Sequence, residues 1–184
     1  MQELFETVNI LRRRRPSFSR TRPKREYRKG NTMTLNAKES QLVKDLKGQE
    51  ELCIEKYSKY AEEAEDSQLT DLFEGIAAVE RKHLSTLTTV ENGGTPDSGG
   101  SSGQTPLPTS FRKAPAEADC DHDRFLCTDL LTTEKHASHL YDTCIFEFRD
   151  ETVRQALNHI QKEEQSHGKL LYDYMKVNGM YEAQ

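Results

Sequence analysis

The sequence repeats itself once, at an offset of 84 residues. Positions 45–87 align with positions 129–171 without a gap and give ten identities over 43 positions. The identical pairs are Asp45/Asp129, Leu46/Leu130, Glu50/Glu134, Tyr57/Tyr141, Glu63/Glu147, Asp66/Asp150, Ile76/Ile160, Glu80/Glu164, His83/His167 and Leu87/Leu171. Because a repeated sequence unit folds into a repeated structural unit, the chain is predicted to contain two similar halves related by a pseudo-twofold axis.

Each half carries two apolar stripes with the spacing of an α-helix. In the first half the stripes occupy 42–60 and 69–87, and Asp66 between them is a helix-capping residue. In the second half they occupy 127–148 and 153–174. Two stripes separated by a short break predict two helices that pack against each other, so each half is predicted to form a helical hairpin.

The segment between the halves, residues 91–119, holds nine of the sixteen glycines and prolines. Neither a helix nor a strand interior tolerates that composition, so the segment is predicted to be irregular. It is long enough to travel the length of a bundle between two helices that run parallel. The predicted fold is therefore all-α: a four-helix bundle with hairpins at 36–90 and 120–178, joined by a long crossover linker.

Each half also repeats the pattern Glu-x6-Tyr followed, thirty residues after the Glu, by Glu-x-x-His. A Glu and a His three positions apart on a helix project from one face, so both can reach one metal ion. The Glu and His residues of this pattern fall inside the apolar stripes, so their side chains are predicted to point into the bundle. They are Glu50, Glu80, His83, Glu134, Glu164 and His167.

Four carboxylates buried together need compensation, because each would otherwise cost on the order of several kcal/mol. Two divalent cations balance four carboxylates, while neutral imidazoles add no charge. The pattern therefore predicts a dinuclear metal site. Glu80 and Glu164, which belong to the two Glu-x-x-His pairs, are predicted to bridge the ions, and Glu50 with Glu134 is the alternative bridging pair.

Other side chains are weaker candidates. Tyr57 and Tyr141 lie two helical turns after Glu50 and Glu134, where a phenol could hydrogen-bond a metal-bound carboxylate or water. Ordinary core tyrosines are the alternative. For Cys53, a small buried hydrophobic residue is favoured over a redox sensor. The histidines outside the repeat are predicted at the surface or the core edge: His122, His136, His139 and His159.

These motifs resemble those of the ferritin-like superfamily of di-iron and di-manganese carboxylate proteins, over roughly residues 36–178. Within that superfamily, residues 125–181, which begin FLCTDLLTTEKHASHLYDTC, closely resemble the Coat F-like spore coat proteins of clostridial bacteria. The resemblance implies a centre of two iron or manganese ions. It also implies a product of sporulation that is located in the cytoplasm or the spore coat.

Two departures from better-known relatives narrow the expected activity. The chain lacks the two CxxC pairs of the rubredoxin-type site in rubrerythrins, and it has Ala137 where they carry an extra carboxylate. Electrons would therefore come from an external donor. The chain also lacks the features with which ferritins build a storage shell, so the resemblance implies a simpler di-iron oxidase or di-manganese site.

Two functions are open on this reading. The first is a metal-dependent oxidoreductase of the peroxidase, catalase or ferroxidase type, which acts on peroxide, O₂ or Fe²⁺ and protects against oxidative stress. The second is a structural coat or assembly protein that binds other coat proteins or its own copies, with a vestigial or purely structural metal site. The complete set of six ligands favours the first, because a scaffold could replace buried ligands with leucine at little cost.

Charge is distributed unevenly along the chain. Residues 1–33 carry a net +7 and the remainder carries −12. An acidic folded part repels phosphate, which disfavours a nucleic-acid-binding domain, and the apolar runs are too short for a transmembrane helix. Residues 1–33 are predicted to be a basic disordered tail before a bundle spanning 34–184. The alternatives are an arm that binds nucleic acid or an anionic surface, and a true start at Met33. The four cysteines form no CxxC pair, which argues against a zinc ribbon or a disulfide scaffold.

Overall fold

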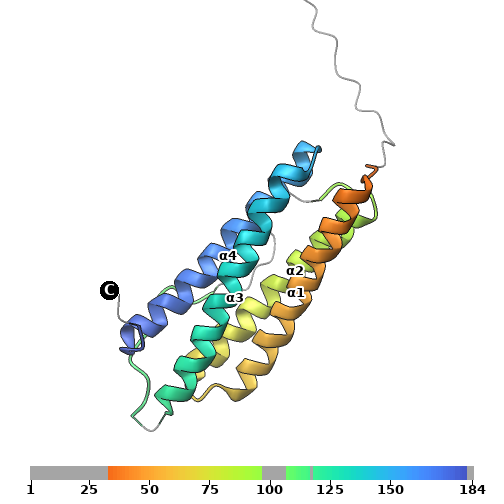
Figure 1. The fold of residues 1–184 in the computed structure, drawn as a ribbon. Helices are drawn as coiled ribbons and strands as arrows, with labels where there is room; N and C mark the ends of the chain where they lie inside the picture. The colour runs from red at the N-terminus through yellow and green to blue at the C-terminus, as the bar shows by residue number, and fades with distance from the viewer. Residues whose placement is uncertain (1–32, 97–106, 117, 182–184) are drawn as a thin grey trace, which may run out of the picture. The chain divides into compact units, whose positions relative to one another are not determined.

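The described part of the chain folds into helices joined by turns and irregular segments (Figure 1). The computed structural model describes residues 33–96, 107–116 and 118–181, and no strand occurs within them. The four helices are α1 (Ala37–Glu63), α2 (Ser67–Glu91), α3 (Cys120–Glu147) and α4 (Glu151–Val177). The predicted all-α four-helix architecture is confirmed.

Helix starts are set by side chains that accept hydrogen bonds from otherwise unpaired backbone N–H groups. Asn36 and Glu39 form a reciprocal capping box at α1. Asp66, Asp119 and Asp150 cap α2, α3 and α4. The caps at Asp66 and Asp150 lie in three-residue turns, so α1 pairs with α2 and α3 pairs with α4 as two tight hairpins.

The two hairpins are arranged so that α1 and α3 run antiparallel. The start of α1 lies beside the end of α3, where Glu39 accepts a hydrogen bond from the Arg149 backbone N–H at 3.0 Å. The start of α3 lies beside the end of α1, where Asp123 accepts one from the Glu65 N–H at 2.9 Å. Helices α2 and α3 are therefore parallel, and the connection between them must run along the bundle, as predicted.

The described part of that connection packs closely on the hairpins. Residues 107–116 have no regular secondary structure. Phe111 contacts Tyr174 edge-on, with ring centroids 5.6 Å apart. The Arg112 backbone exchanges two hydrogen bonds with the Gln68 side chain. The segment therefore covers the end of the bundle at which α2 begins and α4 ends.

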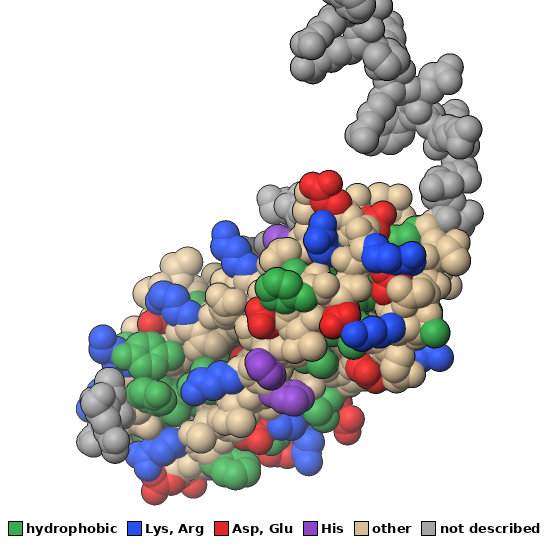
Figure 2. Space-filling view, turned by 45° about the horizontal axis from the view of Figure 1, so that its top comes forward, with side chains coloured by type: hydrophobic (Ala, Val, Ile, Leu, Met, Phe, Trp, Pro, Cys, Tyr) green, Lys and Arg blue, Asp and Glu red, His purple; other side chains and the backbone are tan. Residues whose placement is uncertain are grey.

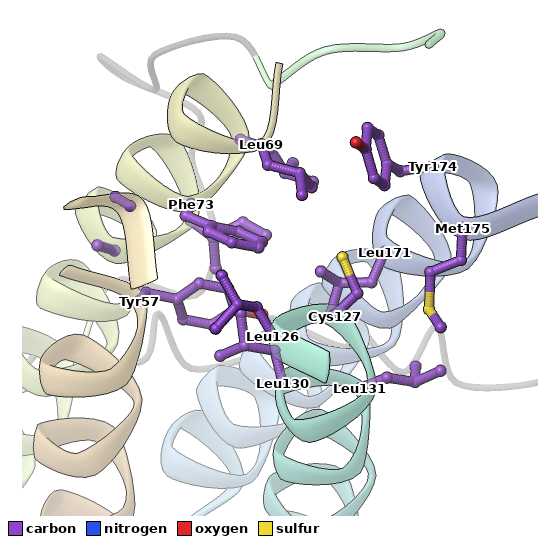
Figure 3. Close-up of a cluster of buried hydrophobic side chains, with 14 of the residues drawn as sticks. Tyr57, Leu69, Phe73, Leu126, Cys127, Leu130, Leu131, Leu171, Tyr174 and Met175 are labelled. Atoms are coloured by element: carbon purple, nitrogen blue, oxygen red, sulfur yellow. The ribbon is translucent and has the colours of Figure 1, made fainter. Parts of the chain in front are cut away.

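The core consists of two clusters of buried side chains, each with residues from all four helices. One is built around Tyr57, Phe73, Leu130 and Leu171 (Figure 3). The other cluster contains the residues 84 positions away from these four, in the same order: Tyr141, Leu157, Leu46 and Leu87. Side chains that the repeat aligns therefore lie at opposite ends of the bundle. Buried polar residues occupy the middle of the bundle.

The described surface mixes both signs of charge. In the face shown in Figure 2, Lys and Arg side chains alternate with Asp and Glu over the described residues. None of the described helices has an apolar stretch suited to crossing a bilayer. The predicted tail falls almost wholly in residues 1–32, which lie outside the described residues, so its boundary stays a prediction.

Candidate metal centre

The middle of the bundle collects the six acidic and histidine side chains singled out by the repeat. Helices α1 and α3 each contribute one Glu, and α2 and α4 each contribute a Glu and a His. All six are at most 2% exposed. They form two overlapping groups, in each of which one donor atom per residue lies within 4.8 Å of the others. The groups are Glu50, Glu80, His83 and Glu164, and Glu80, Glu134, Glu164 and His167.

The overlap of the two groups distinguishes the two kinds of glutamate. Glu80 and Glu164 belong to both groups, whereas Glu50 and Glu134 each belong to one. A carboxylate shared between two ion positions can place one oxygen on each ion. The geometry is thus the one expected if Glu80 and Glu164 bridge, although the bridging role itself stays a prediction.

Both histidines turn the same ring nitrogen toward the carboxylates. His83 Nδ1 lies 2.9 Å from Glu80 Oε2 and 3.0 Å from Glu164 Oε1. His167 Nδ1 lies 2.9 Å from Glu80 Oε1. Each imidazole therefore reaches a carboxylate of the opposite hairpin, so the cluster joins the two halves of the bundle.

Several polar atoms of the cluster form no hydrogen bond of suitable geometry, although Glu80 Oε1, Glu164 Oε1 and His167 Nδ1 each lie within 3.0 Å of an imidazole nitrogen or a carboxylate oxygen. Over the described residues, the buried side-chain nitrogens and oxygens without a hydrogen-bond partner belong to five of these six residues. They are Glu50 Oε2, Glu80 Oε1, Glu134 Oε2, both carboxylate oxygens of Glu164, and His167 Nδ1. Buried polar atoms normally have a partner because leaving one unpaired costs about 1–3 kcal/mol. Oxygen and imidazole donors of this kind fit iron or manganese, which would satisfy them.

Burial also sets the protonation of the carboxyl groups. It raises the pKa of Glu50 to about 8 and that of Glu164 to about 7, with repulsion from neighbouring carboxylates adding to it. Burial raises the pKa of Glu134 well above its usual range. It acts in the same direction on Glu80, but contacts with the two histidines outweigh it and lower that pKa. Without a cation the cluster therefore holds protons at neutral pH, and a bound cation would displace them.

The two tyrosines of the repeat make crossed hydrogen bonds. The Tyr57 hydroxyl on α1 donates to Glu134 Oε1 on α3, and the Tyr141 hydroxyl on α3 donates to Glu50 Oε1 on α1. In each glutamate the other oxygen, Oε2, is one of the unsatisfied atoms. Each phenol thus fixes one oxygen of a carboxylate and leaves the second available to an ion.

The sequence analysis did not identify Glu163. Its carboxylate lies 3.0 Å from His83 Nε2 and 3.2 Å from His159 Nε2. Although burial opposes the charged form of His83, its contacts with Glu163 and the cluster carboxylates raise its pKa well above the usual value. The repeat aligns Glu163 with Val79, so Glu163 is not among the identical pairs. This contact makes the surroundings of the two histidines different.

The remaining candidates lie apart from the centre or have a structural explanation. Cys53 is fully buried, Gln49 Nε2 donates to its Sγ at 3.3 Å, and burial raises its pKa, as expected for a buried apolar residue. The four cysteines are free thiols. Two of the unrepeated histidines, His136 and His139, are exposed, and the other two, His122 and His159, are partly exposed, as predicted.

Comparison with known proteins supports part of the resemblance found in the sequence. Residues 122–184, which include α4 and most of α3, match the family model described as the Coat F domain. The chain is 35% identical over 81 residues to the Uncharacterized protein YusN of Bacillus subtilis (strain 168). That alignment covers 44% of this chain and 66% of the relative's length. No solved structure matches the chain. The match to the Coat F domain thus covers most of the second hairpin, the part of the chain that contains Glu134, Glu164 and His167.

Proposed function

We propose that the protein binds two iron or manganese ions at the six clustered residues and acts as an oxidoreductase on O₂, peroxide or Fe²⁺. The observation that carries this proposal is the set of buried carboxylate and imidazole atoms in mid-bundle that lie close together and lack a hydrogen bond. A stable fold has no reason to keep such atoms unless a ligand satisfies them, because apolar residues of similar size would cost less. The Coat F match covers the segment that contains three of the six proposed ligands, and it supports a spore coat setting.

Each residue has a defined part in this proposal. Glu50 and His83 would hold one ion, Glu134 and His167 the other, and Glu80 with Glu164 both. When bound, iron or manganese supplies the capacity to exchange electrons with O₂ or peroxide. Tyr57 and Tyr141 hold Glu134 and Glu50 in position through their hydroxyl groups. The apolar clusters lie on both sides of the centre along the bundle.

The second candidate is a structural coat protein in which the ions only join the hairpins. The match of residues 122–184 to the Coat F domain favours this candidate, because the match concerns coat proteins rather than any reaction. Such a protein would bind metal and gain stability without turning over a substrate. Metal binding and catalysis must therefore be measured separately.

Anaerobic titration with Fe²⁺ and with Mn²⁺ tests the proposal. We expect two ions per chain and a rise in melting temperature, since a ligand that binds only the folded state stabilises it. Glu164→Ala should abolish stoichiometric binding of the second ion, whereas Glu62→Gln, which changes an exposed acid, should bind both ions. Fewer than two ions in the wild-type protein, with no rise in melting temperature, would refute a metal centre. Two ions without consumption of O₂ or peroxide would favour the structural candidate.

A further inference from the structure

The metal centre is buried, so any substrate needs a path to it. A pocket of about 330 Å³ lies in the groove between α3 and α4. Its walls include Leu131 and Ser138 from α3 and Gly168 from α4, and two residues of the candidate centre, Glu134 and Glu164, also line it. This pocket therefore approaches the centre directly from the surface of the second hairpin.

Small side chains create the space in this groove. Gly168 follows the ligand His167 and has no side chain to fill the gap between the helices. A Cβ atom at position 168 would lie 3.5 Å from Leu131 Cδ1 and 3.8 Å from Glu134 Cβ, which is ordinary contact. A methyl group would therefore fit, while a longer side chain would occupy the pocket itself.

The first hairpin provides an internal comparison, because the repeat aligns its residues with those of the pocket. At an offset of 84, Leu84 stands where α4 has Gly168, and Ile54 stands where α3 has Ser138. Both aliphatic side chains are half-buried. The groove between α1 and α2 thus has branched aliphatic side chains at the two positions where the groove between α3 and α4 has glycine and serine.

The exposed rim of the two grooves also differs in charge. The pocket is bordered by Lys135 and Gln165, which are both exposed. The equivalent residues of the first hairpin are Glu51 and Arg81. The rim between α3 and α4 is therefore net positive, which favours the approach of a small anion or a neutral molecule over that of a cation.

We propose that small neutral or anionic oxidants reach the centre through the pocket between α3 and α4, and that Gly168 and Ser138 keep this route open. The inference rests on the proposed metal centre. It adds that only one hairpin admits the substrate, although both hairpins supply the same ligands. Molecules larger than the pocket are excluded, since the surrounding helices are close-packed.

The test installs the residues of the first hairpin in the second. The variants are Gly168→Leu, Ser138→Ile and the milder Gly168→Ala, and the probe is azide added to the iron-loaded, air-oxidised protein. Gly48→Leu is the matched control, because it adds leucine at an α1 glycine whose Cβ would have no neighbour within 4 Å. Iron content, melting temperature and the rate of azide association are measured for each protein.

We expect Gly168→Leu and Ser138→Ile to retain two irons and to slow azide association by about tenfold or more, because the filled groove blocks the approach. Gly168→Ala should slow it less, and Gly48→Leu should match the wild type. Unchanged azide rates in iron-loaded Gly168→Leu and Ser138→Ile would overturn the route while leaving the metal centre intact. Fewer than two irons in the wild-type protein would overturn the centre and the route together.

Discussion

At the scale of single residues, the two halves of the candidate centre contain the same residue types but differ in the side chains that surround them. His83 has the carboxylate of Glu163 3.0 Å from its Nε2 atom. The position that would serve His167 in the same way is occupied by Val79. A carboxylate behind a ligating imidazole fixes the ring orientation and makes the other nitrogen a stronger donor. The ion beside His83 is therefore expected to bind more tightly than the ion beside His167.

Removing the charge of Glu163 tests this difference. Glu163→Gln should weaken the binding of the ion beside His83 by about tenfold or more, which is the usual effect of losing a group that hydrogen-bonds a metal ligand. The second ion should keep its affinity. Competitive titration of Mn²⁺ resolves the two binding steps, and Glu151→Gln in the first turn of α4 is the control for loss of an acidic charge. Equal weakening of both steps would show that Glu163 acts on the bundle as a whole.

At the scale of helices and turns, each hairpin is held by a carboxylate from the other. Glu39 in the first turn of α1 accepts hydrogen bonds from the backbone and the guanidinium of Arg149, in the turn between α3 and α4. Asp123 in the first turn of α3 accepts hydrogen bonds from the Glu65 and Asp66 backbone N–H groups. Positions 39 and 123 are 84 residues apart, so the same contact occurs at both ends of the bundle.

The Glu39 contact predicts how stability responds to acid. Hydrogen bonds from Arg149 hold the pKa of Glu39 at about 2, below its ordinary value of 4.5. A depressed pKa stabilises the folded state fully above pH 4.5 and progressively less as the pH falls toward 2. Glu39→Gln should therefore be less stable than the wild type at pH 7, and the difference should shrink between pH 4.5 and 2. Urea unfolding across this range measures the difference.

Asp123 serves as the contrasting case for that experiment. Burial raises its pKa despite the backbone hydrogen bonds that it accepts. A raised carboxyl pKa favours the folded state as the pH falls, which is the opposite sign. The difference in stability between the wild type and Asp123→Asn should therefore not shrink as the pH falls, unlike the difference between the wild type and Glu39→Gln. The same pH dependence in both variants would mean that a general charge effect, rather than the Arg149 contact, controls acid stability.

The helices of this chain could be predicted from its sequence, whereas several contacts between the two hairpins could not. Helical periodicity and caps such as Asp66 predicted the four helices, because they depend on neighbours within one turn. The repeat identified the six inward-facing residues because both copies kept them. Neither the helical periodicity nor the repeat predicts a contact between the hairpins at positions where the two copies have different residues. The contact of Glu163 with His83 and the hydrogen bonds from Arg149 to Glu39 were therefore not predicted. The crossed partners of Tyr57 and Tyr141 likewise depend on the antiparallel packing of α1 and α3.

At the scale of the whole molecule, the two apolar clusters and the polar centre form three successive layers. Each cluster includes residues of all four helices, for example Tyr57, Leu72, Leu126 and Leu171 in one of them. The centre between the clusters also takes a residue from every helix. The clusters can therefore hold the helices in register on both sides of the carboxylates even while those carboxylates lack an ion. This arrangement explains how a bundle can tolerate four buried acidic side chains at its middle.

The same layering predicts where the stable unit begins. Among the described residues, the first fully buried apolar side chain is Val43, and all six residues of the candidate centre follow it. Met33 and Leu35 are partly buried against the second cluster, and the Met33 N–H donates to the Gly93 carbonyl at 3.1 Å. Deleting residues 1–32 should therefore leave the melting temperature and the metal stoichiometry nearly unchanged.

Deleting residues 1–35 provides the matched comparison. It removes the two apolar side chains as well, and it should lower the stability by about 1–3 kcal/mol, because each partly buried side chain contributes a fraction of its full transfer free energy. Thermal and urea unfolding of the two truncated proteins measure this step. A large loss of stability already on deletion of residues 1–32 would show that the basic segment packs on the bundle, contrary to its predicted character as a tail. Equal stability of both truncated proteins would place the start of the cooperative unit at the capping box of α1.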